Sequence, residues 1–237
     1  MLINFGDLFP GHYFDAKEDG KREFIKKYID AEAVKESKLA FSNLINSLNI
    51  SPFSNGFVLR CYQCLGDLWF ILPTSTGGKY HGGKLDKENS VGGIFEHISK
   101  VVARSGKVLN RYRELINADG DTYCNYKELL LVACLLHDIG RLGRDCTAVY
   151  SCSDHGEVGA EIIKECWSKG DYQTLFEKEK LSGNLNFSFY LDELVFSVCE
   201  HMYMWRGINF LDRVKVKGLD NSLILCIMLC ECDYYSF

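Results

Sequence analysis

The distribution of proline is the feature that most constrains how this 237-residue chain can fold. The chain has 3 prolines, Pro10, Pro52 and Pro73, and none after Ser90. Because proline lacks a backbone N–H and clashes with the preceding helical turn, its absence leaves room for long helices. Apolar residues after Ser90 recur at intervals of three and four positions and do not alternate, which indicates helix rather than strand. We therefore predict an all-α fold.

The apolar periodicity predicts five helices in this region, near Ile94–Asn117, Tyr126–Ile139, Asp154–Lys169, Leu191–Trp205 and Asn221–Tyr235. Before it, we expect one or two amphipathic helices between Gly20 and Leu48, a break over residues 51–56, and a further helix over Phe57–Leu72. A glycine-rich loop, residues 73–83, follows and continues to Gly93, and is either functional or a plain flexible connection. The predicted organisation is an N-terminal helical extension, residues 1–56, and a main domain, residues 57–237.

Composition and charge narrow the functional classes. With 47% hydrophobic and 25% charged residues, the chain has the apolar content of a globular protein. The formal net charge of -5 argues against a protein that coats nucleic acid, although a local basic patch remains compatible with it. Residues 1–15 lack the basic start of a secretory signal, and the longest apolar run, Leu223–Cys230, is too short to span a membrane. We expect a cytoplasmic protein with no membrane partner.

The cysteines offer two interpretations. The chain has 11 cysteines, and without an export signal we expect reduced thiols in core positions rather than disulfides. Cys61-Tyr-Gln-Cys64 is the only CxxC motif, and a structural zinc site needs a second pair of ligands. Buried or half-buried free thiols are therefore favoured over a zinc ribbon.

Histidines and aspartates fall on, or beside, the apolar stripes of the predicted helices, at His97, His137, Asp138, His155, His201 and Asp233. The His137-Asp138 pair ends an apolar helix, with Gly140 expected as its left-handed C-terminus. Asp154 is the expected N-cap before His155, with Glu157 as its capping-box partner. A single histidine on an apolar face is usually a hydrogen-bonded core residue. Buried carboxylates are harder to explain in that way, because an uncompensated one costs several kcal/mol.

Binding of divalent metal ions would explain why these four histidines and two aspartates face one core. Imidazole and carboxylate ligands together suit transition metals such as Zn, Mn, Fe or Ni better than Ca. Six ligands exceed one tetrahedral site, so two metals bridged by a carboxylate are expected. Two ions about 3.5–4 Å apart form the arrangement that clamps phosphoryl transfer.

The order of these residues resembles the HD superfamily of metal-dependent phosphohydrolases, an all-α fold named for its His-Asp pair. The string from His137 to Arg141 is similar to that family's HDIGK motif, with Arg in place of Lys. Residues 153–161 resemble the segment around the next ligand in ribonuclease Y-like phosphodiesterases. Residues 70–75, His81 and residues 92–97 resemble a run in HD exonucleases and relaxase-associated HD proteins, with one histidine where those families tend to have two.

The resemblance implies an HD-domain helical bundle with a dinuclear site of two divalent metal ions (Mn, Mg, Ni, Zn or Fe). It implies that one metal is held by His97, His137, Asp138 and Asp233. Asp138 then bridges to a second metal, held also by His155 and His201. Asp138 is expected to be catalytic as well as a ligand.

Further residues bear on the substrate. Arg141 either holds a phosphate oxygen or interacts with the helix dipole. His81 is a candidate for contact with a base or phosphate, or for an acid toward the leaving group; a solvent-exposed loop histidine is the alternative. Lys100 and Arg104 begin a basic stripe that continues through Lys107 and Arg111, and Trp205 and Arg206 follow His201. We interpret Lys100, Arg104, Trp205 and Arg206 as substrate-binding, against the default of a solvated helix face.

The expected function is hydrolysis of phosphodiester bonds. The expected partner is the substrate, either single-stranded nucleic acid or a nucleotide. A nucleotidase or phosphatase acting on mononucleotides is the nearest alternative. A di-iron oxygenase shares the same ligand order, and a non-catalytic binding module is the third class. Metal identity, cleavage polarity, RNA against DNA, oligomeric state and the role of residues 1–56 stay open.

Overall fold

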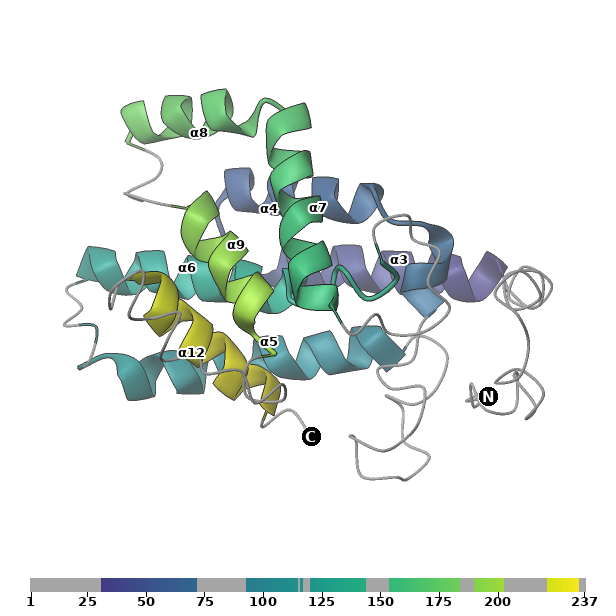
Figure 1. Ribbon diagram of the computed structural model, residues 1–237, viewed down its shortest axis with the longest axis horizontal. Helices are drawn as coiled ribbons and strands as arrows, with labels where there is room; N and C mark the ends of the chain where they lie inside the picture. Colours follow the sequence, from purple (N-terminus) through teal and green to yellow (C-terminus); the bar gives the residue numbers. More distant parts are fainter. Residues whose placement is uncertain are drawn as a thin grey trace.

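Figure 1 shows the computed structural model of the chain, which describes residues 31–71, 93–114, 116, 120–143, 154–183, 190–202 and 221–234. In these residues all regular secondary structure is helical, which confirms the all-α prediction. The elements are α3 (Ala31–Ser47), α4 (Pro52–Gln63), the 3-10 helix η2 (Asp67–Ile71), α5 (Gly93–Tyr112), α6 (Gly120–Leu136), α7 (His155–Lys169), α8 (Tyr172–Leu181), α9 (Leu191–Glu200) and α12 (Asn221–Tyr234).

The centre of the fold is a bundle of five helices. In it, α5 packs on α6, α12 contacts α5, α6 and α9, and α7 lies against α9. On α5, Ile98 and Val101 are fully inaccessible to solvent, so the apolar side of this helix faces the core. Along α6 the run Leu129–Leu136 is buried on all sides, as an entirely apolar helix requires. One continuous hydrophobic core joins these helices.

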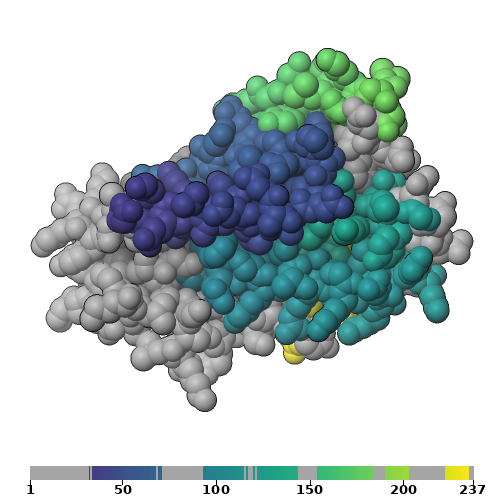
Figure 2. Space-filling model, turned by 180° about the vertical axis from the view of Figure 1, so that it is seen from behind, coloured from purple at the N-terminus to yellow at the C-terminus, as the bar shows by residue number. Residues whose placement is uncertain are grey.

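The N-terminal helices share this core. Phe41 of α3, Phe57 of α4 and Trp69 of η2 are buried in the same cluster of side chains as the central bundle. Figure 2 shows α3 and α4 lying across one face of α5 and α6, with α8 beside them. The described part of the N-terminal region is therefore packed onto the bundle.

Several element boundaries differ from the sequence prediction. The expected break at residues 51–56 is the start of α4, because Ser51 caps the helix and Pro52 occupies its first turn, where proline is favoured. Helix α6 begins at Gly120, before the predicted Tyr126, and α9 ends at Glu200 rather than near Trp205. Helix α8 was not predicted, because Phe176 is its one buried residue and it has no apolar stripe.

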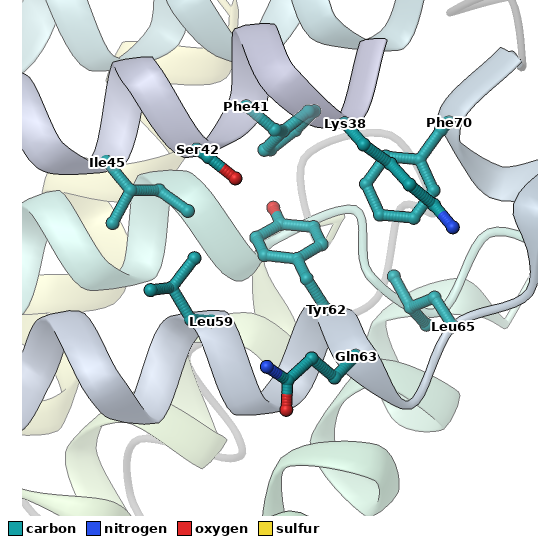
Figure 3. A pocket seen from close by; sticks show the side chains of 9 residues that line it. All are labelled: Lys38, Phe41, Ser42, Ile45, Leu59, Tyr62, Gln63, Leu65 and Phe70. Atoms are coloured by element: carbon teal, nitrogen blue, oxygen red, sulfur yellow. The ribbon is translucent and has the colours of Figure 1, made fainter. Parts of the chain in front are cut away.

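A pocket of about 290 Å³ opens between α3, α4 and η2 (Figure 3). The Tyr62 ring rises from α4 toward α3 in its centre, and apolar side chains form most of its walls. None of its lining residues is one of the six histidines and aspartates singled out above.

None of the described helices is both long and apolar enough to cross a membrane.

Candidate metal centre

The fold brings the six predicted ligands into one buried cluster. His97 lies in α5, His155 begins α7, and Asp233 lies near the end of α12. The other three follow helices: His137 and Asp138 come directly after α6, and His201 is the C-cap of α9. All six side chains are buried, with exposed fractions from 0% for His137 to 7% for Asp233. The prediction that these positions face the core is confirmed.

The His-Asp pair lies in a series of tight turns rather than on a helix. Backbone N–H groups of Ile139 and Arg141 donate to the carbonyls three residues earlier, at Leu136 and Asp138. The prediction that Gly140 is a left-handed C-terminus is wrong, since the positive φ in this turn belongs to Gly143, at 73°. Gly140 serves close approach instead: a Cβ there would lie 2.1 Å from the His155 carbonyl oxygen.

The backbone at the start of α7 also packs closely against the end of α9. A Cβ on Gly156 would lie 2.6 Å from the Cys199 carbonyl oxygen. Asp154 occupies the predicted N-cap position of α7, but its side chain makes no capping hydrogen bond, so the predicted capping box with Glu157 is not formed. The contact of helix backbones, rather than a cap, positions His155 beside His201.

The cluster separates into two groups of three metal-ligating atoms. His97, His137 and Asp233 form one group, and Asp138, His155 and His201 form the other. In the first, Nε2 of His97 lies 3.2 Å from Nε2 of His137 and 3.1 Å from Oδ1 of Asp233. In the second, the Nε2 atoms of His155 and His201 are 3.2 Å apart.

Asp138 lies between the two groups. Its Oδ1 is 3.3 Å from Nε2 of His155 and 3.8 Å from that of His201. Its Oδ2 is 3.3 Å from Nε2 of His137 and 3.6 Å from that of His97. Each carboxylate oxygen therefore faces a different pair of histidines, which is the arrangement of a bridging ligand.

Backbone carbonyls fix the orientation of two of the histidine rings. Nδ1 of His137 lies 2.8 Å from the Cys134 carbonyl oxygen, and Nδ1 of His201 lies 2.6 Å from that of Val198. A proton on Nδ1 that is donated to a carbonyl leaves the lone pair on Nε2, which faces the cluster. The rings are thus held in the tautomer that binds a metal.

The donor set fits divalent cations. Two buried carboxylates and four imidazoles converge, and Oδ2 of Asp138 makes no hydrogen bond, although Nε of Arg141 lies 2.8 Å away in an ion pair. Burial of such oxygens is costly unless a cation compensates their charge. Nitrogen and carboxylate oxygen donors suit transition metals.

Comparison with protein families matches residues 94–237 to the HD domain, more than half of the chain. The chain belongs to the HD-domain family. No curated protein and no solved structure matches the chain. HD domains bind divalent metals and are, as a family, metal-dependent phosphohydrolases, so the cluster is the candidate metal centre of this HD domain.

The charges of the HD pair depend on each other. Burial alone would lower the pKa of His137, but the carboxylates of Asp138 and Asp233 outweigh it and raise that pKa to about 9. Burial alone would raise the pKa of Asp138, but the Arg141 guanidinium and His137 hold it well below its usual range. Burial lowers the pKa of His97 and of His155. Asp138 is therefore an anion able to bind cations at neutral pH.

The other predicted site residues are only partly within the described chain. Arg141 lies against Asp138, so the structure pairs it with the HD carboxylate. Lys100 and Arg104 are half-buried on α5, one and two helical turns beyond His97. Arg111, further along the stripe, forms an ion pair with Glu231 of α12. His81, Trp205 and Arg206 lie outside the described residues.

Sequence reasoning missed the residues that support the HD turn. The indole of Trp69 donates to the Asp138 carbonyl oxygen at 3.3 Å, and the Tyr62 hydroxyl donates to that of Leu135. These carbonyls belong to the end of α6 and the turn after it, where the regular helical hydrogen-bond pattern stops. The Asp138 carbonyl also accepts from the backbone N–H of Arg141. The sequence signals such a role only in that Trp69 and Tyr62 are aromatic residues with a hydrogen-bond donor at the tip. The structure buries both of them.

Proposed function

We propose that this HD domain hydrolyses phosphodiester bonds in single-stranded nucleic acid or in a nucleotide, using two divalent metal ions. The position of Asp138 carries the proposal, because its two oxygens face two separate pairs of histidines. Two bound cations would polarise the phosphoryl group and lower the pKa of the attacking water. In this proposal His97, His137, Asp233 and Asp138 would hold the first ion, and Asp138, His155 and His201 would hold the second.

Positive charge at the edge of the cluster supports an anionic substrate. The Arg141 side chain is 11% exposed and contacts Asp138, so its guanidinium connects the buried ligands with the surface. We assign it to stabilising negative charge that develops on the phosphoryl oxygens. Asp138 orients both groups of histidines and is the residue on which turnover depends most.

A nucleic-acid strand fits the surroundings better than a bare phosphate ester. Lys100 and Arg104 extend along α5 from His97 and offer charge for successive phosphates. His81, Trp205 and Arg206 are proposed to complete this track. The similarity of residues 137–141 to the HDIG motif, and of neighbouring segments to HD exonucleases and ribonuclease Y-like enzymes, supports the same substrate class.

The proposed location is the cytoplasm. The nine described cysteines are free thiols, as a reducing compartment maintains them.

An activity panel tests the proposal. The full chain is stripped of metal, reloaded separately with Mn, Mg, Ni and Fe, and given labelled single-stranded RNA and DNA, a cyclic dinucleotide and nucleoside monophosphates. We expect metal-dependent cleavage of phosphodiesters, reduced at least about 100-fold in Asp138→Asn. Asp192→Asn, an exposed acid on α9, is the matched control and keeps the wild-type rate.

Other outcomes select other functions. Phosphate release from mononucleotides with the strands left intact identifies a nucleotidase. Oxygen-dependent turnover with iron and no hydrolysis in the other metals identifies an oxygenase. Full activity in Asp138→Asn contradicts any function that depends on this site.

A further inference from the structure

Three cysteine thiols meet between α4 and α7, outside the candidate metal centre. Cys61 and Cys64 form the CxxC motif at the end of α4, and Cys166 lies on α7. The Sγ atoms of Cys64 and Cys166 are 3.4 Å apart, although the residues are separated by 102 positions in the sequence. Cys61 also lies close enough to Cys166 to influence its ionisation. The fold has therefore brought a distant thiol into contact with the motif.

Exposure distinguishes the roles of these thiols. Cys61 is fully buried and Cys166 is 3% exposed, whereas Cys64 is exposed at the C-cap of α4. The expectation that the cysteines are buried or half-buried therefore fails at Cys64, as it does at Cys124. A reagent in solution reaches the Cys64 sulfur first.

The three thiols also differ in how readily they lose a proton. The neighbouring thiols of Cys61 and Cys64, with help from the positive charge of Arg60, lower the pKa of Cys166 to about 7 against the effect of burial. Burial raises the pKa of Cys61 and of Cys64. Because thiolates rather than thiols attack sulfur, Cys166 is prepared to react with an oxidised neighbour.

The geometry favours redox chemistry over metal binding. Among the described residues, the spacing of a metal site is found in the two groups of histidines and aspartates and not in the three thiols. Two sulfurs in contact need only to approach further to reach bonding distance, which is about 2 Å for a disulfide.

We propose that Cys64 and Cys166 form a redox modification site, where a hydroperoxide oxidises the two thiols to a disulfide that joins α4 to α7. In the first step the exposed Cys64 gives up its proton to solvent, and its sulfur attacks an oxygen of the peroxide. With hydrogen peroxide as the oxidant, a sulfur–oxygen bond forms, the oxygen–oxygen bond breaks, and the departing hydroxide takes up a proton from solvent and leaves as water. Cys64 is then a sulfenic acid.

In the second step the Cys166 thiolate attacks the Cys64 sulfur. The sulfur–sulfur bond forms, the sulfur–oxygen bond breaks, and hydroxide leaves and is protonated to a second water. The two sulfurs together give up two electrons, which reduce one hydroperoxide. A dithiol reductant reverses the bond by exchange.

The disulfide would join two supports of the metal centre. Helix α4 carries Tyr62, which holds the end of α6, and α7 begins with His155. A cross-link between positions so far apart in sequence restricts the unfolded chain, so the oxidised protein is expected to unfold at a higher temperature.

The test uses the full-length, fully reduced protein in a chelator. It is treated with hydrogen peroxide at about equal concentration, quenched with an alkylating reagent, digested, and analysed by mass spectrometry. We expect one reductant-sensitive peptide pair joining Cys64 to Cys166, and a higher unfolding midpoint after oxidation. Cys64→Ser and Cys166→Ser should lose both signals. Cys124→Ser, which removes another exposed thiol, should keep both.

Three outcomes overturn the proposal. They are a disulfide between Cys61 and Cys64, a disulfide between two chains, and oxidation of Cys64 to sulfinic acid without a cross-link. The mapping is done on the wild-type protein, so it stands even if a serine variant fails to fold. Because no metal or substrate is involved, failure here leaves the proposed hydrolase function untouched.

Discussion

Gly140 shows how a single residue positions half of the candidate metal centre. It lies two residues after Asp138, where the turn presses against the backbone of α7 at His155 and Gly159. A methyl group in this space cannot be accommodated by rotating a side chain, because both neighbours are backbone. The HD turn can therefore lie this close to His155 only because residue 140 carries a hydrogen atom in place of a side chain.

Gly140→Ala is expected to destabilise the fold by about 3 kcal/mol and to weaken metal binding, since α7 must move away from the turn. Gly106→Ala is the matched control, because a Cβ there meets nothing within 4 Å. Gly106 lies inside α5, so alanine should stabilise that helix by up to about 1 kcal/mol. Denaturant unfolding measures both variants. Equal stability of the two would show that the close approach is unimportant.

His137 makes metal affinity depend on pH. With a pKa of about 9, the ring is protonated at neutral pH when no metal is bound, and a metal must displace that proton. Raising the pH removes the proton, so affinity rises with pH and levels off above about 9. We expect the apparent Kd to fall about tenfold for one pH unit between about pH 7 and 8.

Calorimetric titration of the metal-free protein with Mn measures this slope. His137→Gln, which keeps a polar side chain but does not titrate, should show a much flatter dependence. Burial lowers the pKa of His97 and His155, so these rings lose their protons below this pH range. A wild-type affinity that does not change with pH would contradict the assignment of His137.

All six candidate ligands were identified from the sequence, because buried carboxylates such as Asp138 and Asp233 need a cation and their order resembles a known family. The role of Gly140 was misjudged for a physical reason. A sequence shows that a glycine follows a helix, but not which backbone lies against it. The contact between Cys64 and Cys166 was likewise hidden, because it depends on how α4 crosses α7.

At the scale of elements, α4 and η2 support the end of α6. The Tyr62 hydroxyl donates to the Leu135 carbonyl, and the Trp69 indole donates to that of Asp138. Both acceptors lie where the helical hydrogen-bond pattern ends, and Trp69 is fully buried. Elements outside the matched HD segment therefore help to shape the turn that carries His137 and Asp138.

Tyr62→Phe is expected to lower the free energy of unfolding by about 1–2 kcal/mol, because it leaves a buried carbonyl without its donor. The control is Tyr123→Phe, which removes an exposed hydrogen bond from Tyr123 to Asn110 and should cost less than about 0.5 kcal/mol. Thermal unfolding of both variants decides the comparison. Similar losses in the two would mean that the Tyr62 hydroxyl has no special role.

Among the helices that carry ligands, α7 and α12 match their predicted bounds to within one residue, whereas α6 begins earlier and α9 ends earlier than predicted. The prediction failed for a helix without an apolar stripe and for a helix that begins with proline, a residue that usually ends a helix. Helix α8 buries only Phe176, and α4 begins at Pro52 with Ser51 as its cap. Local signals of that kind have more than one structural outcome, and packing selects between them.

At the scale of the whole molecule, the N-terminal helices and the HD segment share one core. The family match begins at residue 94, yet Phe41, Phe57 and Trp69 are buried against the helices that follow. We expect a fragment of residues 94–237 to lack cooperative thermal unfolding, because it exposes the surface that these side chains cover. Near-ultraviolet circular dichroism measures it against the full chain. A sharp transition in the fragment would show that the HD segment folds independently.

The account depends most on Asp138 as a ligand shared by two metal ions. Metal analysis by mass spectrometry, after stripping and reloading with Mn, tests this most directly. The account predicts about two ions per wild-type chain, a clear loss in Asp138→Asn, and wild-type content in Asp192→Asn. A wild-type protein that retains no metal, or an Asp138→Asn variant that retains as much as wild type, would contradict it.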